Sequence, residues 1–260
     1  MPAKPVLWDL DERGVATVTF NRPEVNNAYD GGLIHGVLAA IGELSTKPLL
    51  RVVVLKGNGR HFQAGADLAW IETVRTAAPQ ENVRVSRATA TAVQRLNTAP
   101  VPTVALVQGG CFGGGTGMIA ACDVVIAADN AMFSIAEVRW GLTAAIIIPQ
   151  LNDAIGVRQV RRYALTGERF GAAEARRIGL VHEVVQATEL AAAGARIVEH
   201  LLANGPDAIR QTKAHALASA WGDVDEATFA HLVEAHAAKR QSGEAAEGLA
   251  SFAQKRAARW

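Results

Sequence analysis

FQAGADL at residues 62–68 and GGCFGGG at residues 109–115 form the strongest pattern in this chain. Each stretch follows a short apolar run, and each is predicted to open a helix. A helix N-terminus has unpaired backbone N–H groups and a partial positive charge. Two such ends that converge on one point would hold an oxygen that becomes negative during a reaction. The two stretches therefore predict an oxyanion hole with two donors.

The composition of the chain is that of a globular enzyme. Half of its 260 residues are hydrophobic, and 26 basic residues against 25 acidic ones leave a net charge of +1. This balance predicts no binding to nucleic acid or to an anionic membrane, and no apolar run has the roughly 18 residues of a membrane span. Cys111 and Cys122 fit neither a disulfide framework nor a zinc site. We expect buried free thiols, and a cytoplasmic location because no signal-like segment opens the sequence.

Strand and helix patterns alternate over about two-thirds of the chain. Alternating residues on both sides of a turn cluster predict a hairpin of Val6–Leu10 and Val15–Phe20. Further strands are predicted at Arg51–Lys56, Thr103–Gln108, Val124–Ala127, Ala131–Ile135 and Val181–Val185. Helices are predicted at Asp30–Ser45, Gln80–Asn97, from the triple glycine to Cys122, and at Gln150–Leu165 and Ala172–Ile178. From Ala187 onward the pattern is purely helical, with helices at Thr188–Ala203, Pro206–Ala220, Val224–Lys239 and Glu244–Ala258.

Several motifs occur in a fixed order along essentially the whole chain. They are NRPEVNNA (21–28), FQAGADL (62–68), the glycine segment 109–115 continuing to Cys122-Asp123, EVRWGL (137–142), LTG (165–167), AEA (173–175) and GLV (179–181). Together they resemble the enoyl-CoA hydratase/isomerase family, also called the crotonase family. The resemblance implies an α/β fold in which repeated ββα units wind into a spiral, over residues 1–186. It also implies a helical C-terminal region, residues 187–260, that makes trimer contacts, and trimers that often pair into hexamers.

The resemblance implies an acyl-CoA thioester as substrate. When a proton leaves or joins the α-carbon, or when water adds at the β-carbon, the thioester oxygen becomes an enolate that needs fixed donors. Matching the family motif, those donors are the backbone N–H groups of Ala66 and Gly114. No further cofactor is expected, because CoA is part of the substrate. No metal is expected either, since His231 and His236 are five residues apart and do not share a helix face.

CoA contacts are also implied by the resemblance. They fall on Arg22, Ala28, Ala64, Asp67 and Leu68, and on Phe252 and Lys255 of the last predicted helix, which in relatives reach the CoA of a neighbouring subunit. On the residues alone, Arg22 is equally well explained as a solvated surface charge. Asp67 is a good helix N-cap. We therefore expect its main role to be capping the helix that follows, and any positioning of CoA to result from that capping. Wall residues of the acyl pocket are expected from a loop at Ile71–Gln80.

Glu137 is the residue expected to transfer protons. In hydratases of the family two glutamates hold one water, and Glu137 matches the second of them. Gly117 stands where the first would be, and Thr116 beside it is no base at neutral pH. The gap is expected to free space and remove a negative charge, which would suit a bulky or carboxylate-bearing acyl chain. For Glu137 itself, the structural alternative is an ion pair with Arg139 or another arginine.

Three functions remain open on the sequence. The first is a 2-enoyl-CoA hydratase with Glu137 as acid and base, for which branched and glutaconyl-type acyl chains are candidate substrates. The second is a Δ3,Δ2-enoyl-CoA isomerase, for which one carboxylate suffices as sole base. The third is a non-catalytic acyl-CoA-binding relative. A dinucleotide-binding enzyme is excluded because no Gly-x-Gly-x-x-Gly opens the first strand and helix. Covalent catalysis is not expected, since neither a dehalogenase-type aspartate nor a Gly-x-Ser-x-Gly elbow is present.

Overall fold

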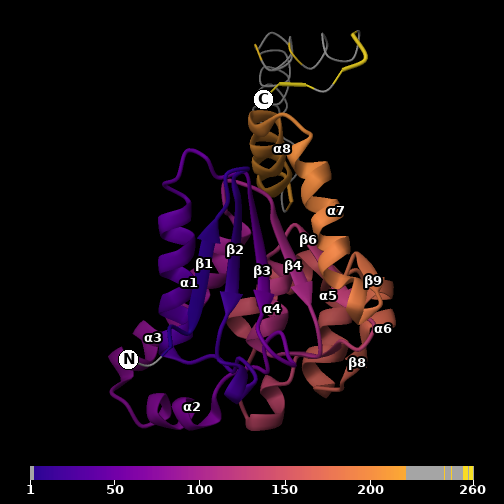
Figure 1. The fold of residues 1–260 in the computed structure, drawn as a ribbon. Coiled ribbons are helices and arrows are strands. Elements are labelled where there is room, and N and C mark those ends of the chain that lie inside the picture. The colour runs from indigo at the N-terminus through magenta and orange to yellow at the C-terminus, as the bar shows by residue number, and fades with distance from the viewer. Residues whose placement is uncertain (1–2, 221–242, 244–246, 248–253, 257, 260) are drawn as a thin grey trace.

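A six-stranded sheet forms the centre of the fold (Figure 1). The computed structural model describes residues 3–220, 243, 247, 254–256 and 258–259. In spatial order the strands are β1 (Val6–Leu10), β2 (Val15–Phe20), β3 (Val52–Gly57), β4 (Thr103–Val107), β6 (Val124–Ala128) and β9 (Glu183–Val185). β1 and β2 form the predicted antiparallel hairpin, and every other neighbouring pair is parallel. The α/β fold class expected from the sequence is confirmed.

A second, three-stranded sheet lies beside the first and was only partly predicted. It consists of β5 (Gly110–Phe112), β7 (Met132–Ser134) and β8 (Phe170–Gly171). β5 pairs with β7 in parallel, with Cys111 opposite Phe133. Because β5 has only three residues and lies within the glycine-rich stretch 109–115, its sequence has the pattern of a loop rather than of a strand. Pairing with β7, about twenty residues away in the chain, makes it a strand.

Eight helices pack around these sheets within the described residues. They are α1 (Gly31–Leu44), α2 (Leu68–Arg75), α3 (Pro79–Asn97), α4 (Gly114–Ala120), α5 (Ile148–Thr166), α6 (Ala172–Ile178), α7 (Leu190–Leu202) and α8 (Pro206–Ala218). Short 3₁₀ turns occur at η1 (Pro23–Val25), η2 (Glu137–Trp140), η3 (Ala145–Ile147) and η4 (Ala187–Glu189). The expected loop at Ile71–Gln80 was largely wrong, because α2 continues to Arg75 and α3 begins at Pro79. Asp67 caps α2 and so extends regular structure into this segment.

The two faces of the central strands are buried against different layers. Alternate residues, such as Val53 and Leu55 of β3, join the main core, whereas Val52 and Val54 join a smaller cluster that includes Val198 of α7. A strand covered on both faces is expected to be a nearly continuous apolar run, as β3 is from Val52 to Leu55 and β4 is from Val104 to Val107. α7 therefore covers the second face of the sheet (Figure 1).

The C-terminal part of the chain differs in one place from its predicted pattern. α8 extends beyond the end of the sheet and has no buried residue (Figure 1). The helix expected at Glu244–Ala258 is wrong at Lys255, whose φ of +50° is not helical. A turn at this point lets the backbone N–H of Arg259 donate to Glu247 Oε1 at 2.7 Å. The helix expected at Val224–Lys239 lies outside the described residues, and the boundary between residues 186 and 187 stays a prediction.

Two further sequence expectations concern membranes and thiols. No helix among the described residues combines the length and the apolarity that crossing a membrane requires. Cys111 and Cys122 are free and buried, as expected. Burial raises the pKa of the Cys122 thiol to about 12, so this thiol stays protonated and unreactive.

Candidate active site

The two glycine-bearing stretches lie side by side, as the sequence predicted. Gln63 of the first stretch pairs with β5 of the second: its N–H donates to Gly110 O at 3.1 Å, and its carbonyl accepts from Phe112 N at 3.0 Å. The Gln63 side chain lies against Gly115, where a β-carbon would approach Gln63 Oε1 to 2.6 Å. The absence of a side chain at Gly115 therefore allows the two stretches to meet.

The first stretch leaves one backbone N–H without a partner. Tyr29 N donates to Gly65 O at 2.8 Å, and Asp67 N donates to Tyr29 O at 2.9 Å. Gly65 adopts φ +91°, which a residue with a β-carbon rarely adopts. These contacts use the carbonyl of Gly65 and the N–H of Asp67, the residues on either side of Ala66. The N–H of Ala66 itself donates to no other described residue. It borders a cavity of about 450 Å³.

The second stretch presents an unused N–H in the same way. Gly113 adopts φ +51°, and its N–H donates to Ser134 O at 2.8 Å. Gly114 begins α4, so its N–H has no acceptor within the helix, and no described residue accepts from it. Ala66 and Gly114 line the same cavity. Two unused donors at one cavity are what an oxyanion hole requires.

The cavity has a volume of about 450 Å³ and is mostly apolar. Only two of its lining residues, Arg75 and Glu137, carry a charge. Arg75 is already paired with Glu72, with two contacts at 2.6 and 2.7 Å. The bulky apolar residues of the wall include Trp70, Ile71, Val74, Val85, Val93, Met118, Trp140, Leu142, Ile146 and Ile147.

Glu137 is the titratable carboxyl group of this cavity. It begins the short turn η2, and one carboxylate oxygen, Oε1, lies 3.1 Å from the position that a β-carbon on Gly113 would take. The other oxygen, Oε2, is buried and has no hydrogen-bond partner. Burial raises the pKa of the Glu137 carboxyl above its ordinary value of 4.5. Among the described residues Glu137 forms no ion pair, so the alternative of a bridge to Arg139 is wrong.

The space beside Gly117 is not free, and here the sequence expectation was wrong. A β-carbon on Gly117 would lie 2.2 Å from Cγ2 of Ile147 and 2.5 Å from its Cβ. Ile147 is buried, and it lines the cavity at this point. An apolar side chain from η3 has therefore taken the place into which the first glutamate would extend. A contact between residues thirty positions apart is not readable from either segment alone.

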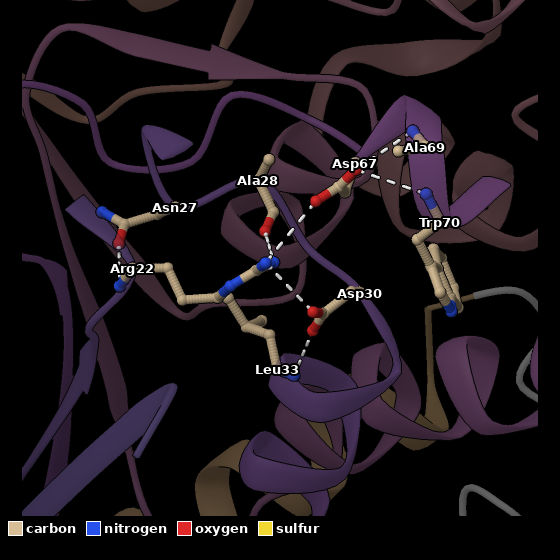
Figure 2. Close-up of polar contacts among 8 residues, drawn as sticks. All are labelled: Arg22, Asn27, Ala28, Asp30, Leu33, Asp67, Ala69 and Trp70. Carbon is tan, nitrogen blue, oxygen red and sulfur yellow. Dashed lines mark hydrogen bonds and ion pairs between the residues drawn. The ribbon is translucent and has the colours of Figure 1, made fainter. Parts of the chain in front are cut away.

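Arg22 joins the first motif to the oxyanion loop (Figure 2). Its guanidinium lies 3.1 Å from Asp30 Oδ2 and 3.5 Å from Asp67 Oδ2, and it also donates to the carbonyl of Ala28. Asp30 and Asp67 cap the N-termini of α1 and α2. The Arg22 side chain is only 17% exposed, which rules out a freely solvated surface charge. One arginine thus holds two helix caps together.

Replacing Arg22 with methionine is expected to lower the free energy of unfolding by about 2 kcal/mol, since two partly buried carboxylates lose a charged donor. Arg13→Met is the matched control. Arg13 pairs with Asp11 and Glu199, but its side chain is 55% exposed, so a change below about 1 kcal/mol is expected. Urea denaturation measures both. Equal effects of the two substitutions would contradict a structural role for Arg22.

The other predicted contact residues fall into three groups. Ala64 and Leu68 line the cavity, whereas Arg22, Ala28 and Asp67 lie next to it without lining it. Lys255 is exposed in its turn. Phe252, like His231 and His236, lies outside the described residues. Direct contacts of these residues with CoA stay predictions, and so does the absence of a metal, although no group of three or more described His, Cys, Asp or Glu residues is arranged to hold one.

Sequence reasoning did not single out Tyr29, which lines the cavity. Tyr29 directly follows the motif residue Ala28, and its ring reaches Gly114, where a β-carbon would lie 2.8 Å from Cε1. An aromatic residue next to a motif that was expected to bind substrate was the available signal. The apolar run Ile146–Ile148 was a candidate lining of the pocket on the sequence, with core packing as the alternative, and Ile147 does line the cavity. Nothing in that run indicated its contact with Gly117.

Comparisons with known proteins show the family of this chain. A family model described as enoyl-CoA hydratase/isomerase matches residues 11–260. A putative enoyl-CoA hydratase from Thermus thermophilus is 34% identical over 98% of this chain and 100% of its own length. A mevalonyl-coenzyme A hydratase from Aspergillus fumigatus is 34% identical over 95% of this chain and 91% of its own. The crystal structure of an enoyl-CoA hydratase from Shewanella pealeana superposes with a TM-score of 0.93 at 33% identity, covering 98% of this chain and 96% of that one.

Proposed function

The chain belongs to the enoyl-CoA hydratase/isomerase family, and from this premise we propose that it is a hydratase acting on a short, branched and apolar 2-enoyl-CoA. The observation that carries the proposal is the pair of unused N–H groups, on Ala66 and Gly114, that border one cavity with Glu137, whose Oε2 has no hydrogen-bond partner. The N–H groups suit a thioester oxygen that becomes negative, and the carboxylate suits a proton that must be moved.

The proposed reaction needs one carboxylate. As the oxygen of water bonds to C3, one water proton passes to Glu137, and the electrons of the C2–C3 double bond move to the thioester oxygen. Ala66 and Gly114 stabilise the resulting enolate by hydrogen bonds. The proton on Glu137 then adds to C2, and the carbonyl re-forms. Dehydration follows the same steps in reverse.

The walls of the cavity support an apolar acyl group over a glutaconyl-type one. A second carboxylate on the substrate would need a free cation. Within the described cavity the only cation is Arg75, which Glu72 already neutralises. Ile147 in the space beside Gly117 adds apolar surface close to Glu137. The mevalonyl-coenzyme A hydratase among the relatives acts, by its name, on an acyl-CoA as well.

A Δ3,Δ2-enoyl-CoA isomerase is the second candidate, because Glu137 alone could lift a proton from C2 and return it at C4. Steady-state assays with crotonyl-CoA, 3-methylcrotonyl-CoA, a 3-enoyl-CoA and 3-methylglutaconyl-CoA separate the two activities. We expect hydration of the first two and slower turnover of the glutaconyl ester. Faster isomerisation of the 3-enoyl-CoA would favour the isomerase. Binding of all four without turnover would leave an acyl-CoA-binding protein.

Hydratase activity is expected to fall as the pH is lowered. The fall should begin at a higher pH than it would if the base were a glutamate with an ordinary pKa. The base must be ionised, and burial raises the pKa of the Glu137 carboxyl above 4.5. The acidic limb of kcat/KM for crotonyl-CoA therefore lies above that value, since this limb reports the free enzyme. A profile that stays flat down to pH 4.5 would contradict an unpaired, buried base.

We also propose that the protein assembles as a homotrimer or as a hexamer of two trimers. Support comes from α8, which extends beyond the sheet (Figure 1). Arg210 and Lys213 attach it to Leu50 and Asp123, but none of its residues is fully buried in the described part of the chain. A helix of this kind is usually covered by a partner. Light scattering coupled to gel filtration gives the mass directly, and a monomer at micromolar concentration would contradict the proposal.

A further inference from the structure

Tyr29 is held firmly between the two parts of the site. Its backbone N–H and carbonyl are bonded to Gly65 and Asp67, at 2.8 and 2.9 Å. Its ring meets the indole of Trp70 edge to face, with 5.9 Å between the ring centroids. A side chain fixed by its backbone and its ring has little freedom to turn away from the cavity. The position of its hydroxyl group is therefore set by the fold.

The hydroxyl of Tyr29 lies at the second oxyanion loop. A β-carbon on Gly114 would be 2.8 Å from Cε1 of the ring and 3.4 Å from the phenol oxygen. Gly114 thus has to lack a side chain for the phenol to be there. Tyr29 lines the cavity together with Ala66 and Glu137. Its hydroxyl has no hydrogen-bond partner among the described residues, so its donor is available to a bound molecule.

The phenol and the Glu137 carboxylate form a complementary pair. Glu137 Oε1 lies against Gly113, and the phenol oxygen lies against the next residue, Gly114. Burial, and to a smaller extent the charge of Glu137, raises the pKa of Tyr29 to about 12. The phenol is therefore a donor at any physiological pH, whereas the carboxylate is an acceptor. Neither Tyr29 Oη nor Glu137 Oε2 has a partner in the described chain.

One oxygen of the bound substrate lacks a donor. The thioester oxygen has two, the N–H groups of Ala66 and Gly114. The oxygen at C3 belongs to the attacking water or to the hydroxyl of the product. Its only partner would be Glu137, which accepts a proton from it and donates no hydrogen bond to it. With Ile147 beside Gly117, no second carboxylate is there to orient this oxygen. A neutral donor on the far side of it would complete its hydrogen bonds.

We propose that the Tyr29 hydroxyl donates a hydrogen bond to the oxygen at C3 of the acyl chain, and so holds that oxygen opposite Glu137. The inference rests on the proposed hydratase function and deepens it. It makes Tyr29 a catalytic residue that contacts the reacting oxygen, and it gives this chain a substitute for the carboxylate that Gly117 lacks. The site would then recognise 3-hydroxyacyl-CoA thioesters better than saturated ones.

The test compares two esters that differ only at C3. Tyr29→Phe keeps the ring and removes the hydroxyl, and Tyr163→Phe makes the same change at a tyrosine that instead contacts Glu174. Both are made in a Glu137→Gln background, so that bound esters do not react, and calorimetry measures the binding of 3-hydroxybutyryl-CoA and butyryl-CoA. Tyr29→Phe is expected to raise the dissociation constant of 3-hydroxybutyryl-CoA about 10-fold, because one hydrogen bond is lost. Butyryl-CoA should be unaffected, and Tyr163→Phe should affect neither ester.

Turnover gives a second readout in the otherwise unchanged protein. Tyr29→Phe is expected to lower kcat for crotonyl-CoA hydration about 10-fold, with a smaller change in KM. If Tyr29→Phe weakened the binding of both esters equally, the phenol would lie at the thioester end and the inference would be overturned. Unchanged binding of both esters would overturn it as well. If the unchanged protein hydrates no enoyl-CoA but Tyr29→Phe still selectively weakens 3-hydroxybutyryl-CoA, the proposed function fails and the contact stands.

Discussion

Replacing Glu137 with glutamine is expected to lower kcat for hydration by roughly 10²–10⁴-fold, the usual contribution of a positioned acid or base. Glutamine preserves the shape of the side chain but can neither take the proton of water nor deliver one to C2. Because the donors on Ala66 and Gly114 are untouched, the dissociation constant for butyryl-CoA should change by less than about threefold. The effect is therefore expected almost entirely in kcat.

Glu12→Gln is the matched control for this substitution. Glu12 is exposed in the turn between β1 and β2, so its amide should leave kcat unchanged. Stopped-flow or steady-state absorbance of crotonyl-CoA measures both variants. A Glu137→Gln protein with full activity would remove Glu137 from the mechanism, and the remaining described cavity offers no other carboxylate to replace it.

The same substitution should make the protein more stable at neutral pH. Burial raises the pKa of Glu137 in the folded state, so its contribution to stability is present below the unfolded pKa and is lost as pH rises through the folded pKa. An amide avoids that loss. The melting temperature of Glu137→Gln should thus exceed that of the unchanged protein at pH 7, and the difference should vanish near pH 4. A variant that is more stable yet inactive is typical of a buried catalytic group.

Replacing Gly117 with alanine is expected to lower the free energy of unfolding by about 3 kcal/mol, the upper range for overpacking a core. The new β-carbon would lie 2.2 Å from Cγ2 of Ile147, and both residues are buried. For a chain of this size such a loss corresponds to roughly 6–12 °C in melting temperature. Differential scanning calorimetry measures the shift.

Gly42→Ala provides the contrast, since it makes the same change in another helix. A β-carbon on Gly42 would have its nearest neighbour, Arg95 Nη1, at 3.5 Å, an ordinary contact. Alanine is the better helix former, so this variant should gain about 0.5–1 kcal/mol. If Gly117→Ala were as stable as Gly42→Ala, Ile147 would not fill the space beside Gly117.

Restoring the first glutamate therefore needs two changes. Gly117→Glu alone meets Ile147, and Ile147→Ala does not relieve the contact, because Cβ of Ile147 would still be 2.5 Å away. Ile147→Gly removes these contacting side-chain atoms, so it is the change to combine with Gly117→Glu. The loss of the carboxylate and the entry of an apolar side chain are thus one structural feature, which explains why the vacant site does not enlarge the acyl pocket.

Local patterns in the sequence predicted much of the backbone. The hairpin of β1 and β2 has the predicted bounds, and α1, β3 and α6 differ from theirs by no more than a residue or so at each end. These elements depend on periodicity, turn residues and caps within one segment. The strand β5 and the helical part of 71–75 were missed because a partner strand and a cap from outside the segment stabilise them. At Lys255 the prediction was wrong because the chain turns towards Glu247.

The order of the motifs, through the family that they resemble, was enough to predict the two loops, their donors and the role of Glu137, since each prediction belongs to a residue type in a short motif. Tertiary structure alone decided that Ile147 fills the space beside Gly117, that Arg22 holds two caps, and that the Tyr29 hydroxyl reaches Gly114. The physical reason is distance along the chain. Periodicity and capping act over a few residues, whereas excluded volume and unpaired hydrogen-bond groups act between any residues that folding brings together.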